Sequence, residues 1–370
     1  MMGRKSRAKL GRRERDRGER TARPSTGRPS VLSEARRARQ QWLAADAERR
    51  RRYGQVRPII QVKHKGYRFV AVGGRLFYAK NWNSFPDFLS HYVRHIFGSG
   101  WWKKEAERPE LDRHPVVRWY DHVMARRREA RTDVDGFVKL DRDGPTNAHI
   151  LLAYDLYVLR HHGKLQSEVI RRLRRHDHFL GARYELWVTS TFIRAGFDVR
   201  FSDESDPSTK HPEFVATHHA TGFVLAVEAK AKFRPGSAAR TPTHVGVKGL
   251  LLKAAEKGPK EPFVVFLDLN VPPCSEAERA AWTAEIDDSV GRVAKKHAPR
   301  TPFDVVAFTN VIHENSLPKD LRSGGMIYTK WPTTSRVPEV VFCAIIGAAQ
   351  QYGNVPNLMP DDPNQPEDTL

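Results

Sequence analysis

One apolar segment carries two charges that a buried strand seldom contains. Residues 223–231 read FVLAVEAKA and predict a β-strand, in which the apolar run Val224–Val227 precedes Glu228 and Lys230. Alternate residues of a strand point to the same face of a sheet, so these two charged side chains share a face. Burying a carboxylate and an ammonium is costly unless they are paired or bind a cation. The segment therefore indicates a charged site built on a sheet.

The chain before this strand predicts a helix and two further strands. The helix covers Gly181–Gly196, where apolar residues follow the 3.6-residue period. Strands are predicted at Phe197–Phe201 and Glu213–Thr217, and a hairpin link, His218–Gly222, leads to the third strand. Carboxylates suit Mg²⁺ or Mn²⁺, and a nearby lysine can orient water or neutralise a phosphate. The side chains that can converge at one sheet edge are Glu185, Glu213, Glu228 and Lys230.

This arrangement resembles the PD-(D/E)XK nuclease superfamily, the restriction-endonuclease-like fold, and is most similar to its Mrr-like branch. The family has a helix with a Glu, a strand opening with Pro-Asp, and a strand carrying (Asp/Glu)-X-Lys. The matching residues, within about 181–270, are Glu185, Pro212-Glu213 and Glu228-Ala229-Lys230, with Glu213 in place of Asp. The superfamily also suggests a role in defence against phage or on a mobile element.

The resemblance implies a metal-dependent endonuclease that hydrolyses phosphodiester bonds of DNA. In that family the residues equivalent to Glu213 and Glu228 bind Mg²⁺ or Mn²⁺, and Glu185 would support this metal or hold a second one. Lys230 would align the attacking water and stabilise the charge that develops on the phosphate. All four residues are therefore expected to be catalytic.

The elements after the third strand complete the αβββαβ order of that core. A helix is predicted at Val245–Lys257, a buried strand at Phe263–Leu269, a helix at Glu276–Lys296 and a strand at Phe303–Thr309. Val340–Ile346 is either a strand or a short buried helix. The expected fold class is therefore mixed α+β, and the resemblance implies a restriction-endonuclease-like α/β domain with a helical and β N-terminal region.

Composition divides the 370 residues into four parts. Residues 1–52 contain 18 Lys and Arg against 6 Asp and Glu and predict a disordered basic arm, helical from about residue 31. Residues 53–145 predict a small β and helical domain, and residues 146–352 the nuclease-like domain. Residues 353–370, rich in Pro, Asn and Asp, predict a disordered tail.

Local signals within these parts predict a meander and a broken helix. Residues 56–80 alternate like three short strands, whose lysines and Tyr67 form either a phosphate-facing surface or, as the favoured interpretation, a solvated face. Ser84 with Asp87 resembles a capping box. Residues 147–179 predict a long helix that breaks at Gly163.

The formal net charge of +20 predicts a polyanionic partner, with nucleic acid first and an anionic membrane surface second. The arm and the basic cluster Arg171–Arg175 are candidate DNA-facing segments that act by phosphate neutralisation, and RNA is the alternative ligand. No apolar stretch is long enough to span a bilayer and no signal peptide is evident, so a cytoplasmic protein is expected. The oligomeric state stays open, and a dimer is one option.

Other interpretations of the same residues remain. The chain is alternatively a non-catalytic nucleic-acid-binding or scaffold protein that retains the nuclease fold, a view that Glu213 favours. In that case the charged strand residues form structural ion pairs. A third, weaker interpretation is an RNA-binding or membrane-surface protein driven by the basic arm. Cys343 is expected in the core, and His218 and His219 in an exposed turn.

Overall fold

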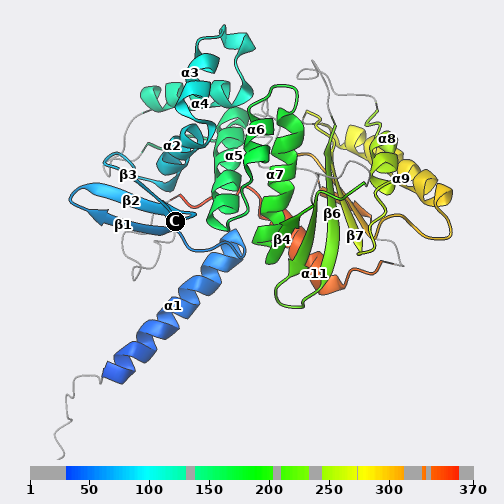
Figure 1. Ribbon diagram of the computed structural model, residues 1–370, viewed down its shortest axis with the longest axis horizontal. Helices are drawn as coiled ribbons and strands as arrows, with labels where there is room; N and C mark the ends of the chain where they lie inside the picture. Colours follow the sequence, from blue (N-terminus) through cyan, green and yellow to red (C-terminus); the bar gives the residue numbers. More distant parts are fainter. Residues whose placement is uncertain are drawn as a thin grey trace, which may run out of the picture. The chain divides into compact units, whose positions relative to one another are not determined.

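The computed structural model describes residues 31–130, 138–202, 210–232, 244–272, 274–311, 327–330 and 335–357 (Figure 1). The chain divides into two units, residues 1–47 and 48–370. Helix α1 (Val31–Tyr53) begins in the first unit, where Trp42 and Leu43 are exposed. The first thirty residues of the predicted basic arm, the loop 233–243 and residues 358–370 of the predicted tail lie outside the described residues.

The end of the predicted basic arm belongs to the second unit. Gln351 and Asn354 donate side-chain hydrogen bonds of 2.9 and 3.0 Å to the carbonyl oxygens of Arg51 and Arg52. These bonds join the start of the second unit to residues close to the end of the described chain. The basic segment that forms a unit by itself is therefore residues 1–47, shorter than the predicted 1–52.

The predicted meander is a three-stranded antiparallel sheet. Its strands are β1 (Ile60–His64), β2 (Tyr67–Val72) and β3 (Arg75–Ala79), with β2 in the middle. Gly66 and Gly73 take positive φ values of 78° and 54°, which glycine adopts without the strain that a Cβ causes. One face of this sheet packs against the helices that follow, because alternate residues of β2 are buried.

The helix α5 (Gly144–His161) is buried over most of its length and is the central helix of the N-terminal half. The others are α2 (Phe85–Phe97), α3 (Ser99–Ala106), a 3-10 turn (Glu110–Asp112), α4 (Pro115–Glu129), α6 (Ser167–Leu173) and α7 (Phe179–Arg194). The capping box of Ser84 and Asp87 is confirmed at the start of α2. The predicted break is also confirmed, since Gly163 has a φ of 70° between α5 and α6.

A six-stranded mixed sheet forms the C-terminal half, in the spatial order β4-β5-β6-β7-β8-β9. Its strands are β4 (Phe197–Phe201), β5 (Phe214–His218), β6 (Val224–Ala231), β7 (Phe263–Asp268), β8 (Val305–Thr309) and β9 (Ile327–Lys330). The first three strands are antiparallel, β6, β7 and β8 are parallel, and β9 is antiparallel to β8. The central strand β6 therefore has neighbours on both sides, and this protects it from water.

Helices cover both faces of this sheet, which gives the mixed α and β architecture (Figure 1). Helix α7 packs on one face, and α5 and α11 (Glu339–Gln350) pack against α7. The other face lies against α8 (Lys248–Ala255) and α9 (Glu276–Lys296). A single hydrophobic cluster on the α7 face contains side chains from both predicted domains, such as Val70 and Val188. The core therefore continues across the boundary predicted at residue 145.

Three local predictions are wrong. Cys343 is exposed, because its position on the helix α11 points away from the buried side that carries Val341 and Ile345. His218 is buried at the end of β5, where its ring packs on Phe197 at 4.8 Å between centroids. Residues 353–357 of the predicted tail are packed: the Phe85 N–H donates to the carbonyl of Asn357 at 3.1 Å.

The described residues contain no helix that is long and apolar enough to cross a membrane.

Candidate active site

Glu228 lies at the centre of the six-stranded sheet and is completely buried. Its neighbours Val227 and Ala229 belong to the hydrophobic cluster under α7, whereas Ala226 belongs to the cluster under α8 and α9. Because strand side chains alternate, Glu228 and Lys230 point to the α8 face. A carboxylate that is buried in this way needs compensation from nearby cations or hydrogen-bond donors.

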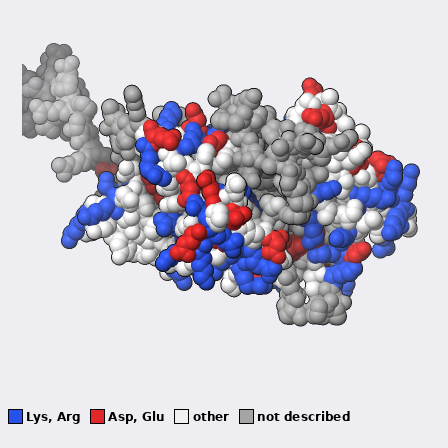
Figure 2. All heavy atoms as spheres, turned by 90° about the horizontal axis from the view of Figure 1, so that it is seen from above, with Lys and Arg blue, Asp and Glu red and all other residues white. Residues whose placement is uncertain are grey.

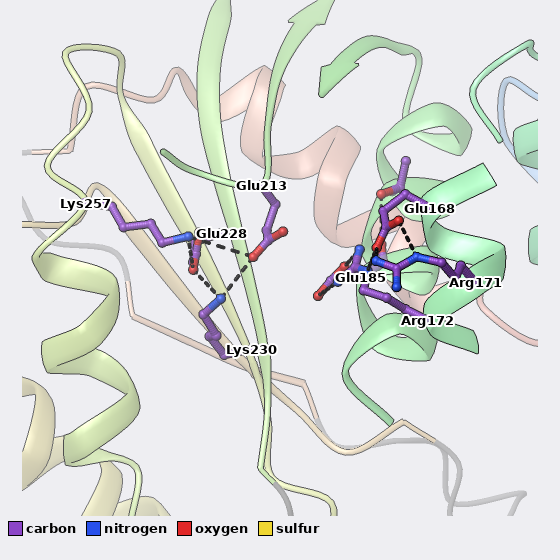
Figure 3. Close-up of polar contacts among 9 residues, drawn as sticks. Glu168, Arg171, Arg172, Glu185, Glu213, Glu228, Lys230 and Lys257 are labelled. Carbon is purple, nitrogen blue, oxygen red and sulfur yellow. Dashed lines mark hydrogen bonds and ion pairs between the residues drawn. The ribbon is translucent and has the colours of Figure 1, made fainter. Parts of the chain in front are cut away.

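Two lysines provide this compensation (Figure 3). The Nζ of Lys230, two residues along the same strand, lies 2.7 Å from Oε1 of Glu228. The Nζ of Lys257, which follows α8, lies 3.0 Å from the same oxygen. By hydrogen-bond geometry neither oxygen of Glu228 has a partner among the residues that the structure describes, and of the two only Oε1 takes part in these ion pairs. One side of this carboxylate is therefore held by ammonium groups, and the other is an unpaired buried acceptor.

Glu213 completes the cluster from the neighbouring strand. It stands immediately before β5, and its Oε1 accepts a hydrogen bond of 2.9 Å from Nζ of Lys230. The same oxygen is 3.9 Å from Nζ of Lys257. The antiparallel register pairs Phe214 with Val227, which brings the start of β5 beside the charged end of β6. We refer to Glu213, Glu228, Lys230 and Lys257 as the charge cluster.

The charges in this cluster influence one another. Burial raises the pKa of the Glu228 carboxyl above its usual range, and the attraction of Lys230 opposes this effect. Burial also acts to lower the pKa of Lys230, but the carboxylates of Glu213 and Glu228 outweigh it, and the pKa of Lys230 is raised. Lys230 is therefore a permanent cation at neutral pH.

Glu185 is on α7 and does not join the charge cluster. Arg172 of α6 holds it with a bidentate ion pair, in which NH2 lies 2.5 Å from Oε2 and NH1 donates to Oε1 at 2.9 Å. Figure 3 shows this pair apart from the lysines, with Glu213 between the two groups. The reason is topological: α7 covers the face opposite to the one on which Glu228 lies.

A cleft of about 460 Å³ nevertheless connects Glu185 with Glu213. It is lined by residues of α6 and α7 and by the ends of β4 and β5, including Gln166, Thr189 and Ser202. Burial, and then the charge of Glu213, raise the pKa of Glu185 to about 7 against the opposing effect of Arg172. The cleft therefore contains a carboxyl group that exchanges a proton near neutral pH, and a second carboxylate that contacts lysine.

The raised pKa of Glu185 predicts a stability difference that depends on pH. Because the folded-state pKa is about 7 and the ordinary value is 4.5, Glu185 stabilises the fold below pH 4.5, and this contribution is lost as the pH rises to 7. We expect the difference in unfolding free energy, native protein minus Glu185→Gln, to be about 3 kcal/mol lower at pH 8 than at pH 4. Urea denaturation at several pH values measures this.

The matched control for this prediction is Glu168→Gln on the neighbouring helix. Arg171 lowers the pKa of Glu168, so its contribution to stability has the opposite sign: it is present above the ordinary pKa and lost in acid. If the unfolding free energies of the native protein and of Glu185→Gln change with pH in the same way, Glu185 does not titrate near neutral pH.

Most of the predicted basic cluster Arg171–Arg175 is already engaged. Arg171 pairs with Glu168 at 2.6 Å, and Arg175 pairs with Asp177 at 2.7 Å. Arg174 donates to the carbonyl of Ile96 at 3.2 Å. Figure 2 shows the same mixing on a larger scale, since Lys and Arg are interleaved with Asp and Glu over the middle of the face it presents. The cluster is thus a network of ion pairs rather than a row of uncompensated cations.

Two members of the site are absent from the sequence-based prediction. Lys257 is the last residue of the predicted helix Val245–Lys257, a position where a lysine is common and gives no functional signal. Arg172 was predicted only as part of the basic cluster, and nothing in its neighbours specifies Glu185 as its partner. Among the described residues, no group of three or more His, Cys, Asp and Glu side chains lies close enough to hold a metal ion.

Comparison with protein-family models, curated proteins and solved structures finds no match to this chain.

Proposed function

We propose that the chain is a metal-dependent nuclease that hydrolyses phosphodiester bonds of DNA on a restriction-endonuclease-like core. The observation that carries the proposal is the contact of Lys230 with both Glu213 and Glu228, at 2.9 and 2.7 Å. The order α7-β4-β5-β6-α8-β7 around this contact matches the order expected for that core.

The donor set of the charge cluster fits a Mg²⁺ ion. Mg²⁺ is bound in proteins by one or two carboxylates, while water and substrate phosphate complete its six ligands. Glu213 and Glu228 supply two carboxylates, and Oε2 of Glu228 is a buried acceptor without a hydrogen bond among the described residues. When bound, the ion would supply charge stabilisation and a more acidic water. In this proposal Glu185, held by Arg172, would support the site from across the cleft rather than within the cluster.

The remaining chemistry follows from the side chains themselves. Lys230 and Lys257 are cations that lie beside the carboxylates, where they attract a phosphate group and stabilise the charge that develops on it. Lys230 is not a proton acceptor at neutral pH, because its pKa is raised. Glu185, with a pKa of about 7, is able to receive a proton from a water in the cleft.

The experiment that tests this proposal combines cleavage with metal binding. Purified protein is incubated with plasmid and with single-stranded DNA in Mg²⁺, in Mn²⁺ and in EDTA, and Mn²⁺ binding is measured by calorimetry. We expect cleavage that requires the metal, and metal binding that is lost in Glu228→Gln. Absence of both cleavage and metal binding would overturn the nuclease proposal.

The second candidate is a DNA-binding protein that retains the core without cleavage. It is favoured by the ion pairs that occupy the carboxylates: lysines contact Glu213 and Glu228, and Arg172 contacts Glu185. In this case the protein binds DNA equally well with Mg²⁺ and with EDTA, and calorimetry detects no Mn²⁺ binding. Measurements of DNA cleavage and of Mn²⁺ binding therefore separate the two candidates.

The basic arm is proposed to increase affinity for DNA. Residues 1–47 contain 14 Lys and Arg against 5 Asp and Glu, so deleting them should weaken non-specific binding and flatten its salt dependence. Each lost phosphate contact lowers the slope of log K against log salt by about 0.9 on duplex DNA. Binding titrations at several salt concentrations measure the slope, with an arm whose Lys and Arg are changed to Gln as the control for length. An unchanged slope after deletion would show that the arm does not contact DNA.

A further inference from the structure

The outer face of the β1–β3 sheet is apolar although it is exposed. In the antiparallel register Val62 pairs with Phe69 and Phe69 with Tyr78, and paired residues share a face. Leu76 and Tyr78 are 63% and 62% exposed. The apolar side chains of this outer face are Ile60, Val62, Tyr67, Phe69, Ala71, Leu76 and Tyr78, and the exposed His64 lies opposite Tyr67 on the same face. Exposed apolar surface that is contiguous in this way marks an interaction site.

Three of these residues form a group of aromatic rings. The ring of Tyr78 lies 5.7 Å from that of Phe69 and 6.1 Å from that of Tyr67, between centroids. Tyr67 and Phe69 are 6.4 Å apart, and both are partly exposed. Tyr78 is the most exposed of the three, so its ring is accessible to a flat ligand that enters from the solvent. We refer to Tyr67, Phe69 and Tyr78 as the aromatic platform.

The surroundings of the aromatic platform are basic. Residues 57–86, which include the whole three-stranded sheet, contain six Lys and Arg and no Asp or Glu, although Lys63, Arg68 and Arg75 lie on the inner face by register. The Nζ of Lys80 lies 4.8 Å from the ring centroid of Tyr67, and Lys65 is exposed in the turn between β1 and β2. A partner for this face must therefore combine flat apolar groups with negative charge.

We propose that the outer face of the β1–β3 sheet binds single-stranded DNA. Bases would stack on the aromatic platform, while Lys65 and Lys80 neutralise phosphates, which is the general way in which proteins bind single strands without reading sequence. A second copy of this chain is a poorer occupant, because two faces of equal positive charge repel each other. The choice of DNA rests on the proposed function, whereas the binding mode follows from this sheet alone.

The experiment measures binding in EDTA, so that cleavage does not interfere. Fluorescence anisotropy compares a labelled oligo(dT) with an abasic strand of the same length, which keeps the phosphates and lacks the bases. We expect the full-length protein to prefer oligo(dT) by about tenfold or more, because stacking on an aromatic side chain contributes that much per base. The basic arm binds both strands, so it does not produce this preference.

Substitutions at Tyr78 identify the platform as the source of the preference. Tyr78→Ala should reduce the preference for oligo(dT) at least about fivefold, and Tyr78→Phe, which keeps the ring, should retain it. Tyr78→Leu keeps an apolar side chain without a ring and should behave like Tyr78→Ala. Because Tyr78 is exposed, these variants are expected to fold, which circular dichroism checks.

Several outcomes would overturn the inference. One is equal binding of oligo(dT) and the abasic strand by the native protein; another is full retention of the preference in Tyr78→Ala. Dimerisation that Tyr78→Ala abolishes would assign the face to a second copy, and tighter binding of an RNA strand would assign it to RNA. Failure of the nuclease proposal has a different signature, namely absence of cleavage in Mg²⁺ with the base preference intact.

Discussion

Glu228→Gln is expected to reduce metal-dependent DNA cleavage by about 10³-fold or more, because it removes a charge from the centre of the proposed site. Lys230→Ala is expected to have an effect of similar size, since Lys230 contacts both carboxylates. DNA binding by Glu228→Gln should change little, because Glu228 is completely buried and does not contribute to a surface that follows phosphates. Cleavage rates and binding constants of the purified variants measure the two effects separately.

The controls for these variants lie close by in the chain. Glu256→Gln changes an exposed carboxylate that pairs with Lys210, and Lys253→Ala removes an exposed lysine of α8. Both are expected to cleave DNA at the native rate. Native cleavage by folded Glu228→Gln and Lys230→Ala would show that the charge cluster is not the active site.

Removing both lysines should destabilise the protein strongly. In the double variant Lys230→Met with Lys257→Met, the buried carboxylate of Glu228 has lost the two ammonium groups within 3.0 Å. A buried ion that loses its partners costs about 3–5 kcal/mol of unfolding free energy. We expect a loss of this size at pH 8 and a smaller one in acid, where the carboxyl group is protonated. Urea denaturation at both pH values measures it.

Adding Glu228→Gln to the double variant should restore most of the lost stability. The amide is uncharged, so it does not need an ammonium group inside the sheet. Lys253→Met, which changes an exposed lysine of the same helix, is the control and should be neutral. A double variant as stable as the native protein would show that Glu228 is already protonated, and the lysines would then have no charge to compensate.

Interactions between residues that are close in the sequence determined the local structure, and the predictions of strands and helices that rest on them are confirmed. The apolar run before Glu228 predicted the strand β6, and the alternation of a strand placed Lys230 on the same side. The helix α9 has the predicted bounds, and a capping box fixes its start because Ser275 and Glu278 satisfy backbone groups only three residues apart. These features depend on contacts within a few residues, which the sequence displays directly.

Tertiary structure decided the composition of the candidate site. The sequence indicated four residues that could converge, but it did not show that α7 packs on the face opposite to Glu228. Glu185 therefore pairs with Arg172 across the cleft, and Lys257 takes a place beside the carboxylates. The side chains of Glu228 and Lys257 are in contact only because the helix α8, which precedes Lys257, packs back against the sheet that contains β6. Long-range packing has no periodic signature in the sequence, and it alone determines which charges a buried carboxylate meets.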